Sequence, residues 1–111
     1  MVGENKIKSI EELSKSMRRI LLEVSFRCGH AAHIGGGLSI IEIMATLYDE
    51  ILKINLKKPV DRFVLSKGHG FLGLLSALHC KGYISKEELL KFQSDGSELI
   101  AHPIENSKFG I

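Results

Sequence analysis

The sequence lacks the features that mark secreted, membrane-bound and nucleic-acid-binding proteins. No apolar run approaches the ~20 residues that span a bilayer, and Met1–Lys6 lacks the apolar core of a signal peptide. The two cysteines, Cys28 and Cys80, both fall within helical apolar patterns, so we expect reduced thiols in a cytoplasmic protein with no membrane partner. A net charge of +2 over 111 residues gives no concentrated basic surface, which argues against a nucleic-acid partner.

What the sequence does have is the composition of one globular domain, 44% hydrophobic and 25% charged, without repeats or low-complexity linkers. S-x-x-E capping boxes predict helices that begin at Ser9, Ser39 and Ser85, which leaves residues 1–8 as a flexible N-terminus. Apolar residues at helical spacing predict the buried faces of the first two helices: Leu13, Met17, Ile20, Leu21, Val24 and Cys28, then Ile40, Ile43, Met44, Leu47 and Ile51.

The remaining elements are bounded by glycine and proline. The glycine run 35–37 is expected to break the chain between the first two helices, so that a loop carries His33. Arg62–Leu65 reads as a buried strand, and Phe71–Lys81 as a helix that Gly82 ends. The order helix, helix, strand, helix, helix indicates the beginning of an α/β layer fold, because one strand needs neighbours for its backbone hydrogen bonds.

Three histidines at glycine-rich turns, His33, His69 and His102, carry the strongest functional signal. Imidazole changes protonation near neutral pH, and glycine lets backbone N–H groups approach an anionic ligand. The turn Gly68–Gly70 follows the predicted strand and precedes a helix, which suits pyrophosphate binding at the helix N-terminus. From the residues alone, a second interpretation is equally well supported. In it, the glycines only permit close helix packing and bind no ligand.

Two other patterns resemble ligand sites but lack residues that such sites require. Gly68–Gly73 matches the dinucleotide pattern G-x-G-x-x-G, but the second strand with its acidic residue is missing about 20 residues later. Cys28, His30 and His33 resemble a metal cluster, yet they lack the four ligands of a structural zinc site. We therefore predict no metal site built from these residues.

Three motifs in this order resemble the N-terminal part of the transketolase family: H-x-G-G-x-L-S-x-x-E-I (His33–Ile43), D-R-F-V-L-S-K-G-H-G (Asp61–Gly70) and G-S-E-L-I-A-H-P (Gly96–Pro103). The resemblance implies that residues 9–111 are the N-terminal portion of a thiamine diphosphate-binding domain, an α/β fold with a parallel sheet that is incomplete here. Family members are more than twice as long even as split subunits, so the resemblance also implies a truncated chain.

The resemblance assigns roles to the motif histidines. His69, flanked by Gly68 and Gly70, would bind the diphosphate of the cofactor. His33 and His102 would be catalytic, lining the channel to the reactive carbon, hydrogen-bonding substrate hydroxyls and assisting proton transfer. The complete enzyme would move a two-carbon ketol unit between sugar phosphates, using thiamine diphosphate and Mg²⁺.

Residues outside the motifs and departures from the family pattern qualify this picture. His30 and His79 match no motif position and are interpreted as structural or exposed. Ala32–Gly35 departs from the G-H-P-G of many transketolases, whereas His102–Pro103 favours transketolases over synthase-like variants.

The family's G-D-G…N metal motif and activating glutamate are not found in the chain. We therefore expect an inactive chain that needs the remaining transketolase segments or subunit, in a homo- or hetero-oligomer. The alternative is a non-catalytic remnant or interaction module.

Overall fold

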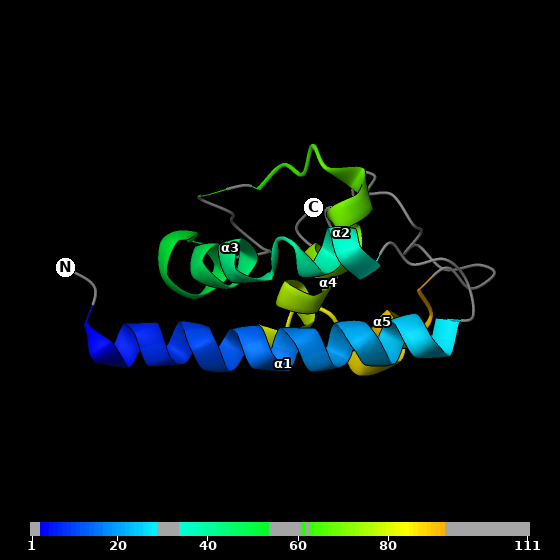
Figure 1. Ribbon diagram of the computed structural model, residues 1–111, viewed down its shortest axis with the longest axis horizontal. Coiled ribbons are helices and arrows are strands. Elements are labelled where there is room, and N and C mark those ends of the chain that lie inside the picture. The colour runs from blue at the N-terminus through cyan, green and yellow to red at the C-terminus, as the bar shows by residue number, and fades with distance from the viewer. Residues whose placement is uncertain (1–2, 29–33, 54–60, 62, 93–111) are drawn as a thin grey trace.

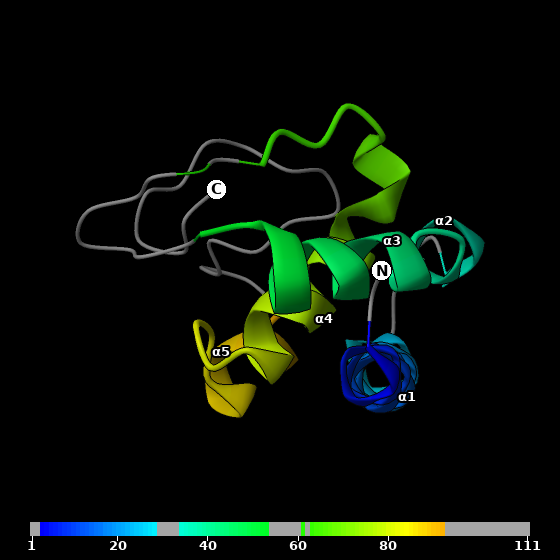
Figure 2. The same cartoon turned by 90° about the vertical axis from the view of Figure 1, so that its left-hand side faces the viewer.

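The computed structural model describes residues 3–28, 34–53, 61 and 63–92, and all regular structure within these ranges is helical (Figure 1). The elements in order are α1 (Glu4–Cys28), α2 (Ile34–Leu38), α3 (Ile41–Thr46), the π-helical turn η1 (Leu47–Ile51), the 3₁₀ turn η2 (Gly68–Gly70), α4 (Phe71–Cys80) and α5 (Lys86–Leu90). Figure 2 shows α1 nearly end-on, with α3 above it and α4 and α5 to one side.

Helix α1 begins earlier than the capping box at Ser9 predicts. The carbonyl of Gly3 accepts the first helical bonds, from the N–H groups of Lys6 and Ile7 at 3.0 and 3.1 Å. Glu4 in the first turn complements the positive end of the helix dipole. The predicted start at Ser9 is therefore wrong, and residues 4–8 of the expected flexible N-terminus are helical.

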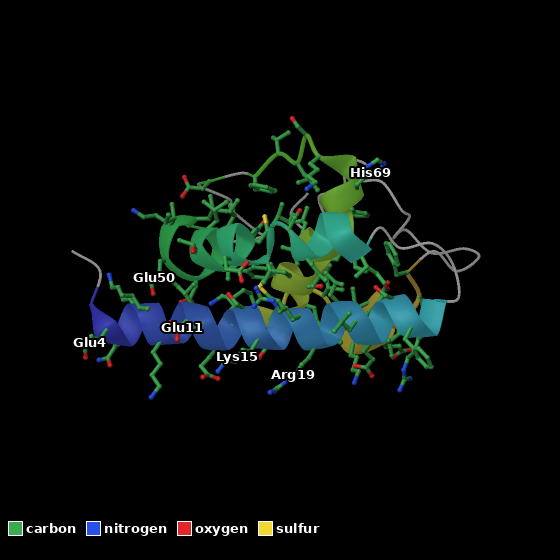
Figure 3. The ribbon with its side chains drawn as sticks, in the orientation of Figure 1. Glu4, Glu11, Lys15, Arg19, Glu50 and His69 are labelled. Carbon is green, nitrogen blue, oxygen red and sulfur yellow. The ribbon has the colours of Figure 1, made fainter. Side chains whose placement is uncertain are left out.

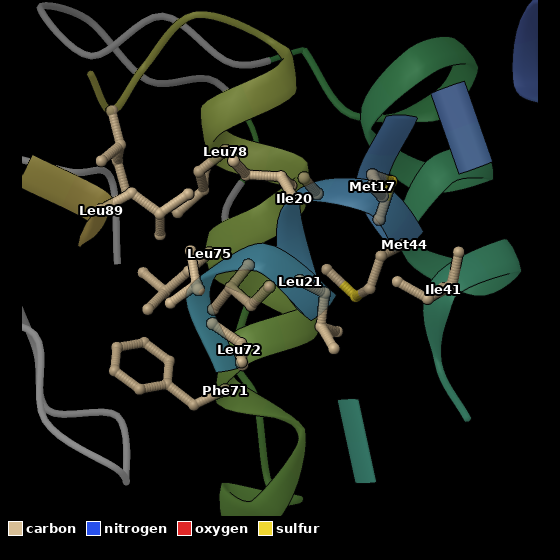
Figure 4. Packing of buried hydrophobic residues seen from close by; sticks show 14 of the residues in the cluster. Met17, Ile20, Leu21, Ile41, Met44, Phe71, Leu72, Leu75, Leu78 and Leu89 are labelled. Carbon is tan, nitrogen blue, oxygen red and sulfur yellow. The ribbon is translucent and has the colours of Figure 1, made fainter. Parts of the chain in front are cut away.

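The buried face of α1 agrees with the sequence prediction. Its fully buried side chains include Met17, Leu21 and Val24, whose spacing of three and four places them on one face. Figure 4 shows Met17, Ile20 and Leu21 packed toward α4 and toward Met44 of α3. The long helix is thus held to the rest of the chain by an apolar stripe.

Helix α4 lies at the centre of this packing. Phe71–Leu78 are all buried, so that eight of its ten residues are shielded on every side. A helix that is apolar all round must be enclosed by other elements, and α4 contacts α1, α2, α3 and α5. The predicted bounds are confirmed to within one residue, and Gly82 ends the helix with a φ of +88°, a conformation that glycine adopts without strain.

Helix α5 begins where its capping box predicts. The Ser85 hydroxyl accepts a hydrogen bond from the N–H of Glu88 at 3.1 Å, as an N-cap residue does. Leu89 and Phe92 are buried against the common core. The predicted start of this helix is confirmed.

The expected break at the glycine run is wrong, because Gly35–Gly37 lie inside α2. A Cβ on Gly37 would lie 2.8 Å from Leu21 Cδ1 and 3.3 Å from the N atom of Gly73. Only glycine lets α2 approach α1 and α4 this closely. Tertiary packing therefore outweighs the low helix propensity of glycine, about 1 kcal/mol per residue.

The predicted capping box at Ser39 and part of the next apolar face are also wrong. The N-cap of α3 is Ile40, which makes no side-chain cap. Ile41, Met44 and Ala45 are buried, whereas Ile43 is 60% exposed; Ile51 is 57% exposed. The N-cap lies one residue later than predicted, and the π-helical turn after α3 departs from the helical spacing that the prediction assumed.

The strand predicted over Arg62–Leu65 is absent from the described part of this segment. Residues 63–65 have no regular structure, and Val64 is 85% exposed. A strand needs partners for its N–H and C=O groups, and no strand is present among the described ranges to provide them. The sheet of the expected α/β fold is therefore not confirmed.

Candidate functional site

The turn η2 joins the irregular segment 63–67 to α4 and carries His69. The N–H of Gly68 donates to the carbonyl of Ser66 at 3.1 Å, and the N–H of Gly70 donates to that of Lys67 at 2.9 Å. His69 is exposed, and Figure 3 shows it on the side of the molecule opposite the outer face of α1. The turn thus presents an imidazole at the N-terminal end of the central helix.

The electrostatics of this end of α4 favour an anion. Its first turn contains no acidic residue, so no carboxylate of that turn offsets the positive end of the helix dipole. Lys67 and His69 immediately before the helix add an ammonium group and a hydrogen-bonding imidazole. Negative oxygens, such as those of a diphosphate, match this set of groups, so the described residues fit the diphosphate end of the implied cofactor.

The backbone contributes less than the sequence suggests. The interpretation of η2 as a phosphate site depends on free N–H groups, but those of Gly68 and Gly70 already donate to carbonyls of the two residues before the turn. The N–H of Phe71 likewise donates to the carbonyl of Gly68. An anion at this turn would therefore interact mainly with side chains, among them the exposed His69 imidazole.

Glycine packing, the second interpretation of these turns, accounts for several of the motif glycines. A Cβ on Gly70 would lie 2.9 Å from Ile40 Cδ1. A Cβ on Gly73 would lie 2.8 Å from the carbonyl oxygen of Gly37. A Cβ on Gly36 would lie 2.4 Å from the carbonyl oxygen of His69. The η2 turn is therefore pressed against α2, and the cofactor-binding roles of Gly68 and Gly70 stay predictions.

A polar link between the two segments was not found from the sequence. Lys67 Nζ donates to Ser39 Oγ at 2.5 Å, and Ser39 Oγ donates to the carbonyl of Gly36 at 2.8 Å. Lys67 and Ser39 are 28 residues apart, and the S-x-x-E pattern had assigned Ser39 to a helix cap. No local pattern in the sequence signals this contact.

Of the other histidines, only His79 can be placed. His33 and His102, the predicted catalytic residues, and His30 lie outside the described residues. His79 Nδ1 donates to the carbonyl of Ile84 at 2.8 Å, and the carbonyl acceptor requires that Nδ1 carries the proton. This bond closes the turn between α4 and α5, which agrees with the structural role expected for His79.

Two side chains, Tyr48 and Cys80, have shifted pKa values. Burial raises the pKa of Tyr48 to about 12, with a smaller contribution from Tyr83, and Tyr48 packs edge-on against Phe63. Burial also raises the pKa of the half-buried Cys80 thiol. Both shifts favour the neutral form and thus mark core positions rather than activated groups.

Metal clusters and membrane spans are both absent from the described ranges. Within them, no group of three His, Cys, Asp or Glu side chains is arranged to hold a metal ion. The helices there are also too short or too polar for any of them to cross a membrane.

Comparison with known proteins places this chain in a family. The family model "Transketolase, thiamine diphosphate binding domain" matches residues 10–111. The chain is 36% identical over 102 residues to an apulose-4-phosphate transketolase subunit of Phocaeicola vulgatus, an alignment that covers 88% of this chain and 36% of that protein.

Two further relatives agree. The 6-deoxy-6-sulfo-D-fructose transketolase subunit SqwG of Clostridium sp. is 38% identical over 97 residues, covering 84% of this chain and 35% of that protein. The transketolase of Treponema pallidum is 37% identical over 101 residues, covering 86% and 15%. The chain thus spans well under half of each of these relatives. Since the family model extends over all but the first nine residues, the chain belongs to the thiamine diphosphate binding domain family of the transketolases.

Proposed function

We propose that this chain supplies part of the cofactor site of a transketolase-type enzyme, which moves a two-carbon ketol unit between sugar phosphates. The observation that carries the proposal is the exposed His69 at the N-terminal end of α4, inside a segment that the family model covers. The names of the relatives support the reaction class, and two of them are transketolase subunits, which supports a partner subunit or segment.

The described residues would act on the diphosphate end of thiamine diphosphate. The His69 imidazole would donate a hydrogen bond to a diphosphate oxygen, and the positive end of α4 would stabilise the negative charge. When bound, the cofactor supplies the electron sink that lets a carbon-carbon bond next to a carbonyl break. Mg²⁺, held by residues of the complete enzyme, would neutralise part of the diphosphate charge.

His33 and His102 are proposed to act on the substrate. Their role would be to hydrogen-bond sugar hydroxyl groups and to move protons during cleavage and re-formation of the carbon-carbon bond. Imidazole suits both tasks, because its ordinary pKa lies near neutral pH. These assignments depend on the motifs alone.

The chain by itself is expected to bind thiamine diphosphate and Mg²⁺ weakly, because the metal ligands of the family motif are not among its residues. Isothermal titration calorimetry of the 111-residue chain with both ligands measures this directly. A micromolar, magnesium-dependent affinity would contradict the need for the remaining segments.

Reconstitution tests the function. The chain is combined with the segments or subunit that complete a transketolase, and ketol transfer is measured as a function of cofactor concentration. His69→Ala should raise the cofactor concentration for half-maximal activity, with activity partly recovered at saturation. His102→Ala should instead lower turnover at saturating cofactor by roughly 10²–10⁴, as loss of an acid-base group does.

The control is Arg19→Ala, which removes an exposed cation from the outer face of α1, far from His69 (Figure 3). It should change neither the cofactor requirement nor turnover. If no completed assembly shows ketol transfer, the proposal is wrong and the non-catalytic interaction module takes its place.

A further inference from the structure

The hydroxyl of Ser39 has a different role from the one its sequence motif indicates. Ser39 lies just after α2, where its N–H donates to the carbonyl of Gly35 at 3.0 Å. Its Oγ turns back to the carbonyl of Gly36 and accepts from Lys67 Nζ. The hydroxyl is therefore committed to a bridge between α2 and the segment before η2.

The bridge fastens the turn that carries His69 from a second direction. Gly36 lies against the carbonyl of His69, so close that a Cβ would not fit, and the same Gly36 accepts the Ser39 hydrogen bond. Lys67, two residues before His69, completes the loop through Ser39. The contacts thus form a closed loop. It runs from Lys67 to Ser39, from Ser39 to Gly36, from Gly36 to His69, and back along the chain to Lys67.

The turn benefits from such support because it is short. η2 spans three residues, and 3₁₀ turns have poor hydrogen-bond geometry. The preceding segment 63–67 has no regular structure, with Val64 and Ser66 exposed. The bridge through Lys67 therefore adds to the contacts that α2 and α4 make with the turn.

We infer that Lys67 is a positioning residue that, through Ser39, holds the His69 turn against α2 so that the imidazole is preset for the diphosphate. This inference rests on the proposed function for the identity of the ligand, but not for the link itself. The competing role, direct pairing of Lys67 with the diphosphate, is an outcome of the test below.

The link is tested first on the chain without ligand, by hydrogen exchange with mass spectrometry. Lys67→Met and Ser39→Ala should each speed exchange about three- to tenfold in peptides that cover residues 34–40 and 66–71, the range that one hydrogen bond allows. Peptides that cover α5 should be unchanged. Lys8→Met, at an exposed position of α1, is the matched control. Unchanged exchange in both variants would overturn the inference.

The consequence for the ligand is tested in the reconstituted enzyme. Lys67→Met and Ser39→Ala should raise the half-saturating thiamine diphosphate concentration by a similar factor, about three to ten, with little change in turnover at saturation. The double variant should be no worse than either single one, because both remove the same link. Lys67→Arg and Ser39→Thr keep the hydrogen-bonding groups and should recover most of the affinity.

Two results in the reconstituted enzyme would count against this role. A Lys67→Met effect much larger than that of Ser39→Ala, and additive with it, would mean that Lys67 contacts the diphosphate itself. Loss of stability without any change in cofactor half-saturation would mean a purely structural link. An inactive wild-type assembly would refute the proposed function alone, since the exchange experiment still decides whether the link holds the turn.

Discussion

Two adjacent glycines of α2 differ in what surrounds them, and this difference can be measured. At Gly35 an added Cβ has nothing within 4 Å, whereas at Gly36 it would lie 2.4 Å from the carbonyl oxygen of His69 and 2.9 Å from its carbon. Both substitutions to alanine gain helix propensity, up to about 1 kcal/mol each. Only Gly36→Ala must push backbone atoms apart, and overpacking of this kind costs about 1–3 kcal/mol.

The shared gain cancels when the two variants are compared. Gly36→Ala should therefore unfold with a free energy about 1–3 kcal/mol lower than that of Gly35→Ala, while Gly35→Ala should be at least as stable as the wild type. Urea denaturation followed by far-UV circular dichroism gives both values. In the reconstituted enzyme, Gly36→Ala should also raise the cofactor requirement, because the displaced atoms belong to His69. Equal stability of the two variants would refute the close packing of α2 on η2.

Three further predictions concern the cap, the core and a buried phenol, each measured by equilibrium unfolding. Ser85→Ala should lower the free energy of unfolding by about 1 kcal/mol, because it removes the cap of α5. Ser9→Ala, inside α1, should be neutral or slightly stabilising. Equal effects would contradict the different positions of the two serines. Leu75→Ala should lower the free energy of unfolding by about 2–5 kcal/mol, because the Leu75 side chain is fully buried. Leu22 is 50% exposed, so Leu22→Ala should lower it by less than about 0.5 kcal/mol. Similar losses at both positions would contradict the assigned core. Burial raises the pKa of Tyr48 from 10.0 to about 12, so the unfolded chain loses its proton first and stability falls as pH rises through this window. The loss is about 3 kcal/mol, because each pKa unit corresponds to about 1.4 kcal/mol, and Tyr48→Phe should remove it. An unchanged slope would refute the burial of this hydroxyl.

Local signals were enough for the C-terminal helices. The end of α4 depends on Gly82, which takes a positive φ, and the start of α5 depends on Ser85, which caps Glu88 three residues later. The helix end at Gly82 and the cap at Ser85 each involve residues within one helical turn of each other, so the local sequence is enough to predict both. The apolar face of α1 was predictable for the same reason, since helical spacing alone defines it.

The same S-x-x-E pattern has three different outcomes. At Ser85 it caps a helix, at Ser9 it lies inside a helix that begins earlier, and at Ser39 the hydroxyl bridges to Lys67. What separates them is whether the preceding residues are already helical, and for Ser39 this depends on α2. That helix exists because its glycines fit against Leu21 and the backbone of α4, contacts between distant parts of the chain.

The strand prediction failed for a related reason. An apolar, β-rich run such as Phe63–Leu65 has the composition of a strand, but a strand is stabilised only when its backbone groups bond to neighbours. The neighbours must come from elsewhere in the chain or from another segment. Helices satisfy their backbone internally, so helical predictions in this sequence were more robust than the one strand.

At the candidate site, ligand binding and helix packing are both explanations of the glycine-rich turn. Packing concerns the glycines, whereas ligand binding concerns the His69 side chain. Gly70 and Gly73 face Ile40 and α2, so substitutions there would report on packing whatever the ligand. The His69 side chain is exposed, and its removal creates no overlap in the core. His69 is therefore the position at which loss of cofactor affinity separates the two explanations, since its truncation should change binding while leaving the packed face of the turn intact.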